Sequence, residues 1–270
     1  MEGFAQVVQM AVLALVQGLT EFLPVSSSGH LVLAKAALGF NAMSGLGVEL
    51  LLHGGTLVAV CLYYRRLIGS VATGLWRREV KAWRFAFAIV VSMIPAVVVG
   101  LLFEEPLERL AECPLFVCGA LVFTGCLLLA TRVWGRDEGR EVSPIRGLLM
   151  GVAQAVAMLP GVSRSGCTIA MSRFLGVGST DAAAFSFLMV VPVVLGGNAL
   201  HVMKTFHGSG GGAFEGLSWP LAVVGFGISA AVGYASVAWM VQLLGRHAFW
   251  RFGFYCLAVG IGGGVFLLLK

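Results

Sequence analysis

Residues 17–30 read QGLTEFLPVSSSGH, a polar stretch set between two apolar ones. Residues 159–168 read LPGVSRSGCT and lie in a similar apolar setting. Both stretches contain Leu-Pro followed by Val-Ser-x-Ser-Gly, with one extra residue, Gly161, in the second. Hydroxyls, a carboxylate, an imidazole and a guanidinium are costly at membrane depth, and they are found there mainly where they line a cavity and have a function. We therefore expect the two segments to meet.

The composition is that of a membrane protein. The chain has 270 residues, of which 59% are hydrophobic and 11% are charged, with a mean hydropathy of +0.93. A soluble domain carries about 25% charged residues. The long apolar stretches indicate helices and not a barrel. Basic residues are confined to a few loops, so the net charge of +5 does not indicate a nucleic-acid partner. The six cysteines contain no CxxC pair, which argues against a zinc site or a disulfide framework.

Hydropathy predicts an all-α integral membrane protein with six transmembrane helices and two re-entrant helical hairpins. Each hairpin, at about 4–40 and 145–176, consists of two short apolar helices around a polar break, because a span needs about 20 residues and neither helix is that long. The six spans are expected at 47–64, 85–103, 114–134, 181–203, 218–244 and 250–269.

The order of elements repeats along the chain. We expect a single membrane domain, 1–270, in which 1–135 and 145–270 are repeats of one hairpin plus three spans. Three crossings invert the second repeat, an arrangement known from transporters. Twelve Lys and Arg residues fall on one side of this layout, in 65–84, 132–146 and the turn before the last span. The positive-inside rule places that side in the cytoplasm and both termini outside.

The first polar segment carries the candidate acid/base groups. Gln17 and Glu21 are four residues apart and share a helix face. Glu21 is a candidate general acid/base or a ligand of a divalent cation. The alternative is a structural carboxylate paired with an arginine or a hydroxyl.

The serines of this segment lie at a turn before a helix, where backbone N–H groups bind anions. Ser26 and Ser27 can donate hydrogen bonds to phosphate, and a serine can attack phosphorus when a base activates it. His30 follows Ser27 by three residues and is expected within its reach. The alternative is that the serines only cap the helix and that His30 is an ordinary core histidine.

The second segment carries the candidate anion clamp. Arg164 lies between Ser163 and Ser165 at the expected tip of a hairpin. Its guanidinium matches phosphate oxygens with two parallel hydrogen bonds and stays charged. We therefore expect a phosphate-bearing ligand here. The alternative is a structural pair with Glu21 or Glu49.

Glu49 and His53 are four residues apart on the first span, close in sequence to the first hairpin. They are candidates for residues that contact and orient the catalytic side chains without touching the substrate. Interhelical hydrogen bonding is an equally good interpretation.

At these motifs the chain resembles the undecaprenyl-diphosphate phosphatases, the bacitracin-resistance family of bacterial membranes. The family motifs match residues 17–30 and 160–168, and the similarity extends along the whole chain. The resemblance implies removal of the terminal phosphate from undecaprenyl diphosphate, which recycles the carrier lipid for peptidoglycan synthesis. It also implies a divalent cation, Mg2+, and a multi-pass protein of the plasma membrane with its site facing outward.

The resemblance also assigns roles to individual residues. It makes Glu21, Ser27, His30 and Arg164 the catalytic core. It makes Gln17, Ser26, Ser163, Ser165 and Thr168 the residues that bind the diphosphate. Gln17 replaces a glutamate common in the family and cannot ionise, so Glu21 is the remaining metal ligand, in part through the substrate. Expected partners are the polyisoprenyl diphosphate, membrane lipids and a second copy in a homodimer.

Two questions stay open, the flippase alternative and the identity of the nucleophile and base, whereas a third reading fails. A flippase for the lipid monophosphate, acting alone or together with hydrolysis, is consistent with the inverted repeat. A purely structural membrane protein does not explain the matched polar segments. Within the hydrolase, either Ser27 or a water can be the nucleophile, with Glu21 or His30 as the base.

Overall fold

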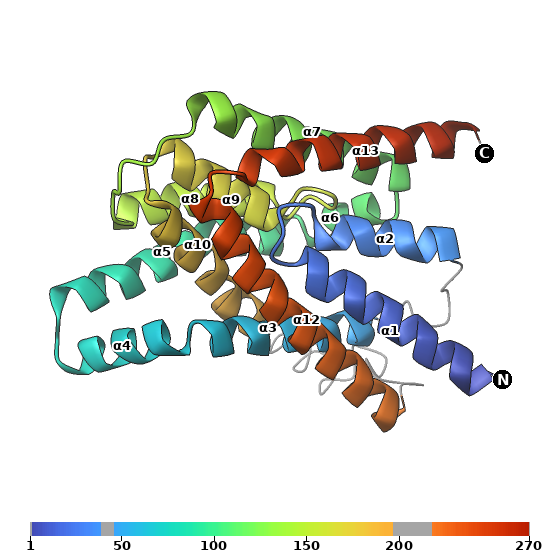
Figure 1. Ribbon diagram of the computed structural model, residues 1–270, viewed down its shortest axis with the longest axis horizontal. Helices are drawn as coiled ribbons and strands as arrows, with labels where there is room; N and C mark the ends of the chain where they lie inside the picture. Colours follow the sequence, from blue (N-terminus) through green and yellow to red (C-terminus); the bar gives the residue numbers. More distant parts are fainter. Residues whose placement is uncertain (1, 39–45, 197–217, 270) are drawn as a thin grey trace.

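The computed structural model describes residues 2–38, 46–196 and 218–269, and its regular elements in these ranges are helices (Figure 1). They are α1 (Glu2–Thr20), α2 (Ser27–Leu38), α3 (Leu46–Tyr63), α4 (Arg65–Trp76), α5 (Val80–Leu102), α6 (Glu104–Ala111), α7 (Pro114–Trp134), α8 (Pro144–Val156), α9 (Arg164–Phe174), α10 (Ser179–Leu188), α12 (Trp219–Gly245) and α13 (Phe252–Leu269). A 3-10 turn, Phe249–Arg251, precedes α13.

Five segments are long and apolar enough to cross a membrane: α5, α7, Ser179–Gly196, α12 and Phe249–Leu269. A sixth crossing results if α3 and α4 form one span, although they meet at an angle of 71°. The all-helical membrane class is therefore confirmed, and five of the predicted spans coincide with candidate spans among the described residues. The end of the predicted span 181–203, from residue 197 on, lies outside them.

The prediction of a loop over 65–84 is wrong for its first part, which forms α4. The arginines at the start of this stretch and just after it suggested a loop, but the mostly apolar residues between them form a helix. Helix α4 packs against α5, and Gly74 permits the close approach. A Cβ atom at Gly74 would lie 2.7 Å from the Cβ of Ala82. Figure 1 shows α4 and the start of α5 extending together away from the rest of the bundle.

Each long helix packs against at least one neighbour: α7 on α13, α3 and α1 on α12, and α5 on α8. Glycines allow this close packing, as is common between membrane helices. For example, a Cβ atom at Gly18 of α1 would lie 2.8 Å from the Cβ of Val232 on α12. The short apolar helices form two further pairs, α1 with α2 and α8 with α9.

The two polar segments form the breaks within these short pairs, and they lie on a common core. Phe22 of the first break, Ile169 of α9 and Phe187 of α10 are fully buried in one cluster. The rings of Phe22 and Phe187 meet edge to face, with centroids 5.4 Å apart. Such contacts add to the stabilisation from burial. The core therefore holds both breaks in place from one side.

Candidate active site

The two polar segments meet, as predicted. The hydroxyl of Ser165 donates a hydrogen bond of 3.0 Å to the carbonyl oxygen of Leu23. A Cβ atom at Gly29 would lie 3.2 Å from the Cα of Gly161, so the two backbones touch where both residues are glycine. Gly161 also has a φ of +92°, which glycine adopts without strain. The extra residue of the second segment therefore forms its turn.

Helices α2 and α9 begin at this junction with the same capping pattern. The hydroxyl of Ser26 accepts from the backbone N–H of Gly29 at 3.2 Å, and that of Ser163 accepts from Gly166 at 3.1 Å. A hydroxyl that accepts from the N–H three residues on is an N-cap interaction. It confirms the predicted capping role of Ser26, and Ser163 has the same role without having been predicted. The first residues of the two helices, Ser27 and Arg164, contact the same carboxylate, so both helix N-termini lie beside it.

That carboxylate belongs to Glu21, which is 8% exposed. Its Oε1 accepts from Nη2 of Arg164 at 2.6 Å, and its Oε2 accepts from the hydroxyl of Ser27 at 2.7 Å. Gln17 donates a further hydrogen bond of 2.9 Å to Oε2. Charge-assisted hydrogen bonds of this length are strong. Glu21 therefore joins a cation and a serine hydroxyl, and the predicted alternative, an ion pair between Glu21 and Arg164, is present.

Exposure divides the predicted site residues into two groups. Ser27, His30 and Arg164 are half-buried. The residues assigned to diphosphate binding are buried: Gln17, Ser26, Ser163, Ser165 and Thr168. Most of their polar atoms already bond within the protein; the hydroxyl of Thr168, for example, lies 2.6 Å from that of Ser186. The first group is therefore partly accessible from outside, whereas the second group bonds within the junction.

His30 contacts different partners from those predicted. Its Nδ1 lies 2.8 Å from the carbonyl oxygen of Ser26, and its Nε2 lies 2.8 Å from the hydroxyl of Tyr255 on α13. A carbonyl only accepts, so Nδ1 carries the proton, and Nε2 of the neutral ring accepts from the phenol. The described side-chain contacts of His30 do not include Ser27. Tyr255 was missed because it lies in an apolar span 225 residues away in sequence.

His53 is closer to the centre of the site than its sequence position suggested. Its Nε2 lies 3.6 Å from Oε2 of Glu21. Its Nδ1 lies 2.8 Å from the carbonyl oxygen of Glu49, which fixes the orientation of the ring. The structure therefore brings His53 into the site through its side chain, and Glu49 supports it through the backbone.

A resident metal ion fits this set of donors poorly. Oε1 of Gln17 is buried without a hydrogen-bond partner and could ligate a cation. However, the guanidinium of Arg164 occupies one side of Glu21. Mg2+ binds through carboxylates and water in octahedral geometry. No group of three or more His, Cys, Asp or Glu residues in the described part of the chain is arranged to hold a metal. The divalent cation stays a prediction, and no step below depends on it.

Replacing Tyr255 with phenylalanine tests the contact with His30. The change keeps the stacked ring, whose plane lies within 9° of that of His30, but removes the hydroxyl. We expect kcat/KM for phosphate release to fall by about 10-fold, the value of one hydrogen bond, and the pH profile of kcat to change.

The matched control for this variant is Tyr234→Phe, because the Tyr234 ring contacts Tyr63 and not His30. Both variants should unfold at the wild-type temperature. Equal kinetics and equal pH profiles in the two variants would refute a positioning role for Tyr255.

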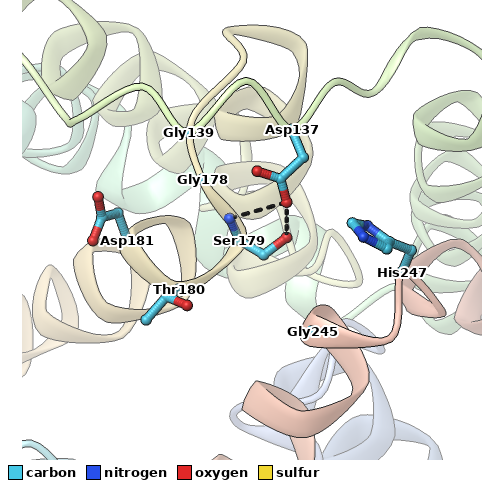
Figure 2. Close-up of a pocket in the computed structure, with 8 residues that line it drawn as sticks. All are labelled: Asp137, Gly139, Gly178, Ser179, Thr180, Asp181, Gly245 and His247. Carbon is cyan, nitrogen blue, oxygen red and sulfur yellow. Dashed lines mark hydrogen bonds between the residues drawn. The ribbon is translucent and has the colours of Figure 1, made fainter.

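A second polar cluster lines a cavity of about 310 Å³ at the far end of α9 (Figure 2). Asp137 points toward Ser179 and accepts hydrogen bonds from its backbone N–H and its hydroxyl. Asp137 also forms an ion pair of 2.7 Å with Arg173, in the last turn of α9. Arg173 lies about 14 Å along the helix from Arg164, at 1.5 Å per residue. This cluster therefore ties a loop to α9 and α10 and is separate from the Glu21 site.

Replacing Asp137 with asparagine should lower stability without changing kcat. Hydrogen bonds from Ser179, and then from Arg173, hold the pKa of Asp137 below its usual value. The stabilisation is therefore complete above the ordinary carboxyl pKa, about 4, and is lost as the pH falls through the lower folded-state value. Because Asp137 is exposed and solvent screens its contacts, we expect a loss of no more than about 1 kcal/mol at pH 7 that shrinks toward acid pH.

Thermal unfolding in detergent at neutral and acid pH measures this loss. The control is Glu105→Gln, whose ion pair with Arg109 is more than 80% exposed on both sides and should contribute little. A loss for Asp137→Asn that is the same at both pH values would contradict the linkage.

Comparison with known proteins identifies the family. The family model described as bacitracin resistance protein BacA matches residues 10–262. The chain is 39% identical to an undecaprenyl-diphosphatase of Christiangramia forsetii over 261 residues, covering 94% of this chain and 96% of that protein. It is 36% identical to an undecaprenyl-diphosphatase of Rubrobacter xylanophilus over 274 residues, covering 98% and 99% of the two chains. The chain belongs to the bacitracin resistance protein BacA family.

Proposed function

We propose that this chain hydrolyses undecaprenyl diphosphate to undecaprenyl phosphate and inorganic phosphate at the Glu21 site. The relatives carry this activity in their names, and the family description carries bacitracin resistance. In this proposal the product is the carrier lipid that peptidoglycan synthesis uses again. One observation supports the location above all others. A buried carboxylate bonds a serine hydroxyl and a guanidinium where two helices begin.

Substrate binding starts with Arg164. Its guanidinium bonds Glu21 in the structure, and a diphosphate offers it more charge and two parallel acceptors. The N-termini of α2 and α9 lie beside the same place and favour an anion through their N–H groups and dipoles. When Arg164 turns to the diphosphate, Glu21 becomes free to accept a proton. Binding of the substrate and activation of the base are therefore coupled.

In the first step, Ser27 Oγ attacks the terminal phosphorus. Its proton passes to Oε2 of Glu21, which it already contacts at 2.7 Å. The bond from the terminal phosphorus to the bridging oxygen breaks, and this oxygen leaves with the electron pair as part of undecaprenyl phosphate. Water then attacks the phosphoserine, Glu21 returns its proton to Ser27, and His30 accepts the proton of the water. Charge neutralisation and positioning supply most of the acceleration in such transfers.

Two choices in this mechanism follow from contacts. Glu21 is preferred over His30 as the first base because Ser27 already donates to it. Ser27 is preferred over a water as the nucleophile because it is half-buried beside both Glu21 and the start of α2. The buried hydroxyls of Ser163, Ser165 and Thr168 act on the diphosphate indirectly, by holding Arg164 and its helix in place.

The proposed architecture has six spans and two re-entrant hairpins, α1–α2 and α8–α9, in inverted repeats 1–135 and 145–270. Its support is local: the two pairs are short, their breaks meet, and the hydroxyls of Ser26 and Ser163 each accept from the backbone N–H three residues on. We further propose that the site opens to the outer face and that both termini lie outside, as the distribution of arginine and lysine indicates. A homodimer and Mg2+ remain predictions.

Phosphate release by the purified protein tests the function. Wild type should release phosphate from undecaprenyl diphosphate, and Ser27→Ala should release almost none. Ser70→Ala is the control, because Ser70 is exposed on α4 and bonds only its own helix. The opposed hairpins also suit a flippase. A pure flippase would release no phosphate, and its lipid transport in vesicles would survive the loss of Ser27 and His30.

A further inference from the structure

A hollow of about 370 Å³ lies where α5 and α8 begin, away from Glu21. We call it the interfacial groove. Its lining residues combine four apolar side chains with two arginines: Val80, Trp83, Phe87, Pro144, Arg78 and Arg84. None of them takes part in the proposed reaction.

The apolar side of the groove lies at the start of α5, a helix long and apolar enough to span a membrane. Val80, Trp83 and Phe87 lie on one face of α5, and they are 71%, 56% and 57% exposed. Further along α5, Val90, Ile94 and Leu101 are exposed as well, as expected for a lipid-facing helix. Tryptophans concentrate where headgroups meet acyl chains. The groove therefore continues from the headgroup layer onto a surface covered by acyl chains.

The polar side of the groove has an excess of positive charge. Neither Arg78 nor Arg84 forms an ion pair with any residue that the structure describes. The neighbouring Lys81 is paired with Glu141 at 3.3 Å, so it adds little net charge. The N-termini of α5 and α8 add partial positive charge at the same place. The groove thus offers an anion two unpaired guanidiniums above an apolar surface.

We propose that the interfacial groove binds one anionic phospholipid. The headgroup phosphate lies between Arg78 and Arg84, and an acyl chain follows Val80, Trp83 and Phe87. Basic pockets at the ends of membrane helices bind acidic lipid headgroups in this way. Charge complementarity selects the lipid over a second copy of the chain, because the rim is basic and a symmetric contact would bring like charges together.

Lipid titration of the purified protein tests this proposal. Native mass spectrometry in detergent should show one phosphatidylglycerol bound in preference to phosphatidylcholine. The double variant Arg78→Gln/Arg84→Gln should lose about 10-fold or more of this preference, because each basic residue near a lipid surface contributes about fivefold. The control is Arg65→Gln/Arg66→Gln, which removes the same charge from the far end of α4.

A second measurement does not depend on the double variant. Phosphatidylglycerol with brominated acyl chains should quench tryptophan fluorescence of the wild type more than that of Trp83→Phe. Equal quenching in both proteins would overturn the proposal. So would equal lipid preference in the two double variants, or a wild type that binds both lipids alike. A wild-type dimer that becomes a monomer in Arg78→Gln/Arg84→Gln, with lipid binding unchanged, would assign the groove to a second copy instead.

Discussion

Replacing Arg164 with lysine should lower kcat/KM for undecaprenyl diphosphate by about 100-fold or more, the range seen when a donor to a developing charge is removed. Lysine keeps the charge but not the planar fork that bonds two phosphate oxygens at once. It also lacks the two separate nitrogens, Nη2 and Nη1, through which Arg164 bonds Glu21 and the carbonyl oxygen of Ser186. Steady-state phosphate release by the purified variant measures the effect.

The same helix supplies the control for this variant. Arg173 is 12% exposed, and it pairs with Asp137 at the other end of α9. Arg173→Lys should therefore lower the unfolding temperature to a similar extent while leaving kcat close to that of the wild type. If both lysine variants kept wild-type turnover, Arg164 would be a structural residue and the proposed anion clamp would be wrong.

Replacing Glu21 with glutamine should lower kcat by about 1,000-fold, within the range for loss of a general base. The amide keeps the shape of the side chain, but it cannot accept the proton of Ser27, which lies 2.7 Å away. Binding should respond differently. Arg164 loses its ionic partner, so its guanidinium becomes more available to a phosphate, and KM should stay the same or fall. Steady-state kinetics and titration with a non-hydrolysable diphosphate separate the two effects.

This split between kcat and KM distinguishes the proposal from its alternatives. A purely structural Glu21 would change kcat only through misfolding, which circular dichroism and thermal unfolding detect. A stability loss of about 3–5 kcal/mol is the upper range for breaking a buried ion pair, and the partial exposure of Arg164 at 18% should reduce it. If the folded Glu21→Gln variant kept its turnover, His30 or a water-bound base would have to replace Glu21 in the first step.

The predicted spans and the observed ones agree because hydropathy is a property of each stretch by itself. Residues 114–134 are apolar over their whole length, and α7 has the same bounds. Helix α4 was not predicted, because the arginines at its two ends made the stretch look like a loop. Its packing against α5 is visible only in the tertiary structure. The places where the helices break followed from the two polar stretches, but Arg164 turned out to begin α9 and not to lie in the turn.

The sequence by itself determined that this is a helical membrane protein with two polar breaks, and that an acid, a serine, a histidine and an arginine belong to those breaks. Only the tertiary structure decided which of these groups bond one another. It placed His53 of α3 beside Glu21, and it placed Tyr255 of α13 within hydrogen-bond distance of His30. The physical reason is that burial depends on local composition, whereas the partner of a buried polar group depends on which helix packs against it.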